Sequence, residues 1–109
     1  MEMPKNIYAW KWLIKPEYVE EYVKLHINAW PDLLEAHSKA GFKNYSIFQN
    51  GNEFFYYFET DDFEKAMSGL DKDPVCMRWN AITSKMIEFS VDFSSNSPLP
   101  LMHQVFFLK

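Results

Sequence analysis

The sequence predicts a single α+β domain of the split βαβ, ferredoxin-like type, in which helices pack on one face of a four-stranded antiparallel sheet. The chain has 109 residues, enough for one domain and too few for two. Strand and helix patterns follow one another in the order β, α, β, β, α, β. No repeat, low-complexity tract or linker divides the chain, so we expect residues 1–109 to form one unit.

The N-terminal part predicts one strand and a helix in two pieces. Apolar residues occupy both alternating faces of residues 7–14, which is typical of a strand covered on both sides. Pro16 is expected to open the first helical piece, since proline at the first position loses only an N–H that has no partner there. Pro31 cannot donate a helical hydrogen bond, so we expect a break near residues 27–30 and a second piece that begins at Pro31. Gly41 suits the C-terminal cap of that piece.

The middle of the chain predicts a hairpin and two further helices. Residues 42–49 and 53–59 are the expected strands, and Asn50-Gly51 between them is a strong turn signal because both residues tolerate positive φ. Asp61 and Glu64 form a possible capping box for a short helix to about residue 70. The pair Asp73-Pro74 predicts the start of the next helix. The apolar residues expected on one face of that helix are Val75, Trp79, Ile82, Met86 and Phe89.

The C-terminal part predicts a loop over residues 94–100 and a last strand over residues 103–108. One layer of helices would leave the other face of the sheet bare. With 18% aromatic residues, that face would be an apolar patch too large for a monomer. We therefore predict a homodimer in which the C-terminal strand takes part in the contact.

Composition excludes several classes of protein. A net charge of −4 and a pI near 5.3 argue against nucleic acid as a partner. Cys76 is the single cysteine, so no internal disulfide and no multi-cysteine zinc site is expected, and an inert buried thiol is the simplest interpretation of it. No signal peptide and no apolar run long enough for a membrane span is recognised. We expect a cytoplasmic protein with no membrane partner.

Tyr22, His26 and Trp30 are four residues apart and share a helix face. An imidazole on an aromatic face has two interpretations, and the pattern alone leaves both open. His26 is either a buried histidine bonded to a backbone carbonyl or a general acid/base, since its ordinary pKa suits proton transfer at neutral pH. The spacing of His26, His37 and His103 matches no ligand pattern, so no metal is expected.

These residues belong to a longer resemblance. Residues 21–33 read E-Y-V-K-L-H-I-N-A-W-P-D-L and resemble the E-Y-x-x-x-H-x-x-x-W-P-E/D-L segment of the L-rhamnose mutarotase family. The resemblance continues at residues 44–48 (N-Y-S-I-F), 73–79 (D-P-V-C-M-R-W) and 105–108 (V-F-F-L). These blocks stand in family order and extend over nearly the whole chain.

The resemblance implies a dimeric α+β barrel that interconverts the α and β anomers of a 6-deoxy-L-hexose by acid/base ring opening, without cofactor or metal. It implies that His26 is the proton donor and that Tyr22 and Tyr45 contact the sugar. The family has a pair of tryptophans on the late helix, of which Trp79 matches the first and Asn80 replaces the second.

Two departures from the family pattern bear on the sugar. A ring that stacks is replaced at Asn80 by an amide that forms hydrogen bonds, which can change the hydroxyl configuration that is preferred. Gln104 stands where the rhamnose members have a carboxylate. We expect L-rhamnose as the substrate and keep L-fucose as an open alternative. Trp79 and Trp30 are expected as apolar walls of the site, and an interpretation as core rings stays open for both.

Two other classes of function remain open. Ferredoxin-like dimers of this size include cofactor-free monooxygenases and small-molecule binding proteins, which would use the rings to hold an apolar ligand. A purely structural protein would bind no sugar. The polar residues among the rings favour a sugar, because sugars need hydrogen bonds as well as stacking. These polar residues are Tyr22, His26, Tyr45 and Asn80.

Overall fold

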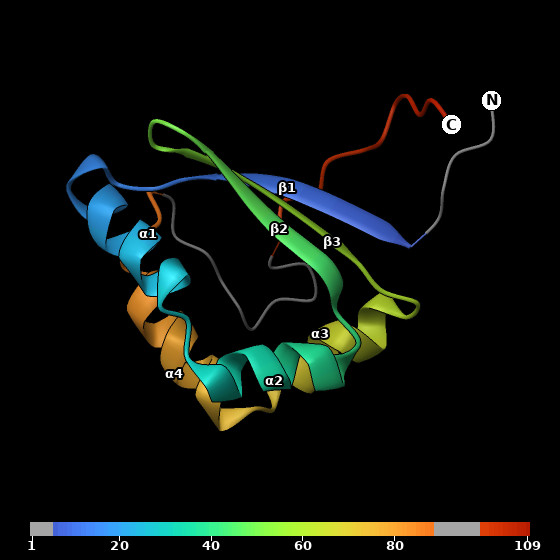
Figure 1. Cartoon of the computed structure of the whole chain (residues 1–109), viewed down its shortest axis with the longest axis horizontal. Helices are drawn as coiled ribbons and strands as arrows, with labels where there is room; N and C mark the ends of the chain where they lie inside the picture. The colour runs from blue at the N-terminus through green and yellow to red at the C-terminus, as the bar shows by residue number, and fades with distance from the viewer. Residues whose placement is uncertain (1–5, 89–98) are drawn as a thin grey trace.

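The computed structural model describes residues 6–88 and 99–109, and within them three strands form one antiparallel sheet in the order β1-β3-β2. Helices cover one face of this sheet (Figure 1). The α+β class is confirmed. The elements are β1 (Ile7–Leu13), the 3-10 turn η1 (Pro16–Tyr18), α1 (Val19–Ile27), α2 (Pro31–Ala40), β2 (Lys43–Asn50), β3 (Glu53–Glu59), α3 (Phe63–Asp71) and α4 (Pro74–Thr83).

The central strand β3 gives the sheet two different faces. Phe54, Tyr56 and Phe58 are buried, while the residues between them are only partly covered. This alternation follows from the two-residue period of a strand, which sends every second side chain toward the helices. Tyr56 lies opposite Trp10 of β1, and their rings stack with centroids 4.7 Å apart.

The predicted break between the first two helices is confirmed. α1 ends at Ile27 and α2 begins at Pro31, whose missing N–H excludes it from the interior of a longer helix. Gly41 ends α2 in the left-handed conformation, with φ of 102°, and its N–H is bonded to the carbonyls of His37 and Ser38. The two consecutive helices can therefore meet at an angle and form one side of the molecule (Figure 1).

The predicted hairpin is present, with one irregularity that the sequence did not reveal. Gly51 has the positive φ that the tight turn requires, whereas Asn50 ends β2 with an ordinary backbone. Near the start of β2 the pairing shifts register between Lys43 and Ser46, and Asn44 takes a φ of 50°. Such a bulge re-aims the side chains that follow it.

The last two helices correct two details of the predictions. The cap of α3 is Asp62, whose carboxylate accepts from the N–H of Lys65, rather than Asp61. The prediction of one apolar helix face reaching Met86 is wrong, because α4 ends at Thr83 and the chain then turns toward β1. Ile87 forms a bridge with Ile14 there. The residues that α4 buries are Cys76, Trp79 and Thr83, and Phe89 lies outside the described residues.

The predicted fourth strand is not formed in the described chain. Leu101 makes a single antiparallel bridge to Trp10, and the N–H of Met102 donates to the carbonyl of Ala9. Residues 103–109 then have no regular structure. The bridge lies on the free edge of β1, where a fourth strand would be added, but a strand needs a continuous series of pairs that this segment does not find in its own chain. Of the predicted loop over residues 94–100, only Leu99 and Pro100 are described.

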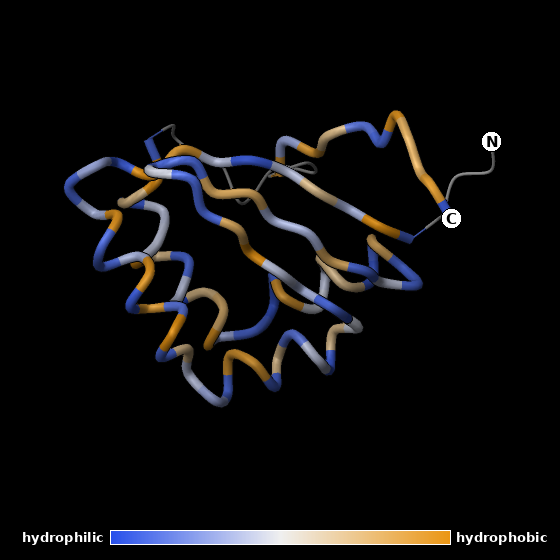
Figure 2. The backbone as a smooth tube through the Cα atoms, turned by 45° about the horizontal axis from the view of Figure 1, so that its top comes forward, coloured by the Kyte–Doolittle hydropathy of each residue, from blue (hydrophilic) through white to orange (hydrophobic). Residues whose placement is uncertain are grey.

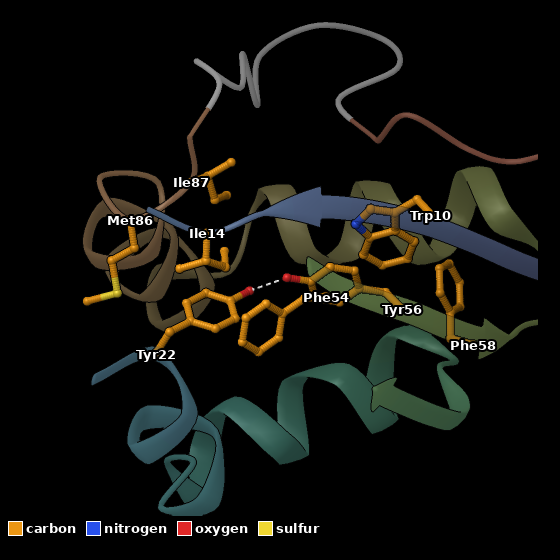
Figure 3. Packing of buried hydrophobic residues seen from close by; sticks show 8 residues of the cluster. All are labelled: Trp10, Ile14, Tyr22, Phe54, Tyr56, Phe58, Met86 and Ile87. Carbon is orange, nitrogen blue, oxygen red and sulfur yellow. Dashed lines mark hydrogen bonds between the residues drawn. The ribbon is translucent and has the colours of Figure 1, made fainter. Parts of the chain in front are cut away.

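The main core lies between β1, β3, α1 and the turn after α4 (Figure 3). A second cluster joins the helices, with Leu33, Cys76 and Trp79 at its centre. Together the clusters fix α1, α2 and α4 to one another and to the sheet, which positions the site described below. No helix in the described ranges is long and apolar enough to cross a membrane. The buried residues of the main core are Trp10, Ile14, Tyr22, Phe54, Tyr56, Phe58, Met86 and Ile87.

Candidate active site

An inner cavity of about 90 Å³ lies between the helices and the sheet, and an outer cleft of about 400 Å³ adjoins it. Their walls are mainly aromatic and aliphatic, with a few imidazole, phenol and amide groups among them. This mixture is typical of a site for a small molecule that needs both packing and hydrogen bonds. The residues that line both spaces are His26, Leu33, His37, Phe42, Tyr45 and Trp79.

His26 lies in the last turn of α1, with its ring in the cavity wall. Its Nδ1 is 2.8 Å from the carbonyl oxygen of Tyr22. A carbonyl can only accept, so Nδ1 carries the hydrogen, and Nε2 is the acceptor nitrogen of the neutral ring. No hydrogen bond occupies this Nε2 within the described ranges. One nitrogen is thus bonded to the backbone while the other is left for a bound molecule.

The rings around His26 hold it in place and alter its titration. The centroid of the Tyr22 ring is 4.5 Å from that of the imidazole, and the Trp79 ring meets it edge-on at 5.1 Å. Burial lowers the pKa of His26 below its ordinary value of 6.5, and the bond to the Tyr22 carbonyl offsets part of this effect. At neutral pH the free imidazole is therefore mainly uncharged, with Nε2 able to accept a proton.

Tyr22 and Tyr56 form a buried pair of phenols whose oxygens are 2.6 Å apart (Figure 3). Burial raises the pKa of Tyr22 to about 12, and burial together with the nearby Tyr22 raises the pKa of Tyr56 further. Both groups therefore stay protonated at neutral pH. Two hydroxyls carry two hydrogens and their mutual bond uses one, so the pair keeps one O–H that can donate to a bound molecule.

Tyr45 lies within the bulge of β2 and lines both the cavity and the cleft. The residue as a whole is 38% exposed, and its ring lies 6.2 Å from that of Trp10 and 5.8 Å from that of His37, between centroids. The bulge thus places a phenol at the junction of the two spaces, where it can meet a ligand that enters from the cleft.

α4 contributes Cys76, Trp79, Asn80 and Thr83 to the inner cavity, and Trp79 and Asn80 are neighbours in the sequence. No described residue bonds the side-chain amide of Asn80, so it is available to a ligand. Trp30 does not line either space. Its ring packs edge-on against Trp79 at 5.2 Å, with the Arg78 guanidinium 5.8 Å from its centroid. Five of the six residues predicted for the site therefore share one cavity, and the sixth supports the ring of one of them.

Sequence reasoning missed several cavity residues, of which Tyr56, Trp10 and His37 carry polar groups that matter below. Tyr56 and Trp10 face the helices from adjacent strands, and the strand alternation of residues 53–59 was the signal that could have identified Tyr56. Nε1 of Trp10 is buried and has no hydrogen-bond partner among the residues that the structure describes, which leaves an N–H donor unsatisfied in the cavity wall. His37 was considered only as a metal ligand, although it lies in the last turn of α2 as His26 lies in the last turn of α1.

The described residues contain no group of three or more His, Cys, Asp or Glu side chains that could hold a metal ion. Cys76 is buried, and burial, followed by the charge of Asp73, raises the pKa of its thiol to about 11. A thiol with this pKa is protonated at neutral pH and is a poor nucleophile. The imidazole, phenol and amide groups that line the cavity are suited to proton transfer and hydrogen bonding.

Comparison with known proteins shows which family the chain resembles. A family profile described as L-rhamnose mutarotase matches residues 7–108. An L-rhamnose mutarotase from Bacillus subtilis is 34% identical over 92 residues, which is 82% of this chain and 85% of that protein. One from Tolumonas auensis is 33% identical over 98 residues, 87% of this chain and 90% of that protein. A solved structure of an L-rhamnose mutarotase from Formosa agariphila superposes with a TM-score of 0.73 over 94% of this chain and 98% of that chain, and at 21% identity it shows the fold alone.

Proposed function

Because this chain belongs to the L-rhamnose mutarotase family, we propose that it interconverts the α and β anomers of L-rhamnose at the inner cavity. The observation that supports this site best is the open Nε2 of His26 in a wall that also offers a phenol pair and an amide. L-Fucose, another 6-deoxy-L-hexose, remains the alternative substrate.

The reaction needs proton transfer at two oxygens that are both bonded to C1, the anomeric hydroxyl oxygen and the ring oxygen. The anomeric hydroxyl loses its proton, the bond between C1 and the ring oxygen breaks, and the ring oxygen gains a proton. Rotation about the C1–C2 bond turns the other face of the aldehyde to the hydroxyl that attacks, and the reverse proton transfers close the ring. No electrons leave or enter the sugar, so we propose that no cofactor takes part. Positioned acid/base groups typically supply about 10²–10⁴-fold, which suffices for a reaction that also proceeds unaided.

His26 is the proposed proton-transfer group, acting through Nε2. Its bond to the Tyr22 carbonyl keeps the ring orientation fixed while Nε2 gains or loses a proton. The phenol pair of Tyr22 and Tyr56 donates its remaining O–H to a sugar oxygen, and Tyr45 contacts the sugar from the outer side.

The residues of α4 and the ring behind them are proposed to pack against the sugar and to select among sugars. The Trp79 ring covers an apolar face of the sugar, and Trp30 keeps that ring in place from behind. The Asn80 amide pairs with a hydroxyl, so it selects among sugars that differ in hydroxyl configuration.

Proton NMR saturation transfer tests the activity directly. One anomeric proton is saturated and the intensity of the other is followed, with L-rhamnose, L-fucose and D-glucose side by side. We expect exchange of L-rhamnose well above the buffer rate and D-glucose near it. Faster exchange of L-fucose would revise the substrate and keep the reaction. Buffer rates for both 6-deoxy sugars at high protein concentration would overturn the proposal.

We also propose a cytoplasmic location, as expected from the sequence.

We further propose that two copies of the chain associate along the free edge of β1. Val105 and Leu108 are 77% and 81% exposed, and the apolar C-terminal stretch lies outside the sheet and helices on the β1 side (Figure 2). Beside it, a groove along β1 is lined by Ile7, Tyr8 and Met102, among others. Pairing of residues 103–108 with a second copy would complete the expected fourth strand and the dimeric α+β barrel.

A further inference from the structure

The proposed reaction moves protons at two oxygens, and His26 accounts for one of them. We propose that His37 is the second proton-transfer group and serves the oxygen that His26 does not. This inference rests on the proposed mutarotation. It starts from the placement of both imidazoles in the walls of the same cavity and the same cleft.

The two rings are held in the same way by consecutive helices. Nδ1 of His37 is 2.9 Å from the carbonyl oxygen of Leu33, four residues earlier on α2, as Nδ1 of His26 is 2.8 Å from that of Tyr22 on α1. The carbonyl fixes the hydrogen on Nδ1 of the neutral ring, so Nε2 is the exchangeable nitrogen in both cases. Leu33 is buried and lines the cavity, and Leu25 of α1 packs against the cluster that contains Leu33, so both helices contribute to the same wall.

The Nε2 atom of His37 is open to a ligand. No other hydrogen bond is made by this ring in the part of the chain that the structure describes, and its Nε2 is not among the buried atoms that lack a partner. The ring packs against Phe42 at 5.1 Å and against Tyr45 at 5.8 Å between centroids. These contacts fix its position without using Nε2.

The surroundings of His37 act on its pKa in opposite directions. Burial lowers its pKa, while the Leu33 carbonyl and, to a smaller degree, the Asp73 carboxylate raise it. One imidazole must act as the base and the other as the acid, so the active form has one ring neutral and the other protonated. The titratable groups that share the cavity with His37 or act on it are His26 from α1, Tyr45 from β2, Asp71 from α3, Asp73 and Cys76 from the start of α4, and Tyr22 and Tyr56.

Atoms balance in this arrangement. The neutral imidazole takes the proton of the anomeric hydroxyl while the protonated one gives its proton to the ring oxygen, as the bond between C1 and that oxygen breaks. The two rings then have exchanged states, and ring closure on the other face of the aldehyde reverses both transfers. The pair carries one proton before and after each turnover.

The test compares His37→Gln with Lys39→Gln, which removes an exposed charge from the same helix. Glutamine keeps a polar amide but does not titrate in this range. We expect His37→Gln to lower the maximal exchange rate of L-rhamnose by about 10²-fold, with a smaller change in the half-saturating concentration. The wild-type rate should follow a bell-shaped pH profile, and the variant should lose one limb of it. Lys39→Gln should match the wild type in both.

A ring-nitrogen NMR titration gives a second readout that needs no turnover. Added L-rhamnose should shift the Nε2 resonances of His26 and His37 together and leave that of His103 nearly unchanged. Wild-type exchange at the buffer rate would contradict the proposed function. An active wild type with His37→Gln within about threefold of it, and with the same bell-shaped profile, would overturn this inference alone.

Discussion

The helix-covered face of the sheet and the free edge of β1 are both rich in apolar side chains, but these side chains are arranged differently in the two regions. On the covered face, rings pack tightly and their polar tips either pair, as in Tyr22 and Tyr56, or point into a cavity. At the edge, residues 105–108 expose apolar side chains beside a groove. The first arrangement suits a small polar ligand, and the second suits another protein surface.

The difference teaches that position relative to the helices, rather than residue type, decides the role of an aromatic residue here. Two phenylalanines on opposite faces of the sheet test this rule, since Phe58 of β3 faces the helices and Phe48 of β2 lies on the uncovered face. Phe58 is 0% exposed and Phe48 is 65% exposed. We expect Phe58→Ala to lower the free energy of unfolding by about 3–5 kcal/mol, because a buried ring leaves a cavity.

Phe48→Ala is the matched control. It should cost about 1 kcal/mol or less, since it loses only cross-strand contact on an open surface. Urea denaturation followed by far-UV circular dichroism measures both. Equal losses for the two variants would contradict the contrast between the two sides.

The phenol pair allows a sharper test of the covered face. Tyr22→Phe leaves the Tyr56 hydroxyl buried without its partner and should cost about 1–3 kcal/mol. Adding Tyr56→Phe removes the second hydroxyl as well, so the double variant should recover part of that loss. A double variant as destabilised as the sum of the singles would show that the two hydroxyls do not interact.

Sequence reasoning identified most of this region and missed its second imidazole. Pro31 predicted the helix break because its ring restricts the backbone, and Gly51 predicted the hairpin turn because it tolerates positive φ. The bulge at Asn44 and the meeting of Tyr22 with Tyr56 depend on pairing between segments far apart in the chain, which local patterns do not encode. The end of α4 was misplaced because the apolar spacing to Met86 continues after the helix has stopped. The position of His37 in the cavity wall depends on how α1 and α2 meet in space, which the sequence pattern does not encode.

The two cavity histidines predict a pH dependence of stability. Burial lowers the pKa of both below the 6.5 of the unfolded chain, so the unfolded chain binds more protons between these values. The free energy of unfolding should therefore fall as the pH drops through 6.5 and level off, for this contribution, below the lowered pKa values. Urea denaturation from pH 7.5 to 5 measures it. His37→Gln should flatten the slope, whereas an unchanged slope would show that His37 titrates as in the unfolded chain.

The smallest effect on the fold of one chain is expected at the free edge. Phe106 is exposed, so Phe106→Lys should change the unfolding of the separate chain by about 0.5 kcal/mol or less. The same change should prevent association, because it places a charge in an apolar contact. Sedimentation equilibrium should give twice the chain mass for the wild type and the chain mass for the variant. A wild type at the chain mass over a wide concentration range would contradict the dimer.

The central claim is that the covered cavity is the site of anomer exchange and that His26 moves the proton. Its most direct test is the saturation-transfer exchange rate of L-rhamnose with wild type and His26→Asn, where the asparagine amide can still donate to the Tyr22 carbonyl. Lys24→Gln, on the exposed side of the same helix, is the control. We predict a loss of about 10²–10⁴-fold for His26→Asn, down to the buffer rate at the limit, and no loss for Lys24→Gln. A folded His26→Asn variant that exchanges L-rhamnose as fast as the wild type would contradict the account.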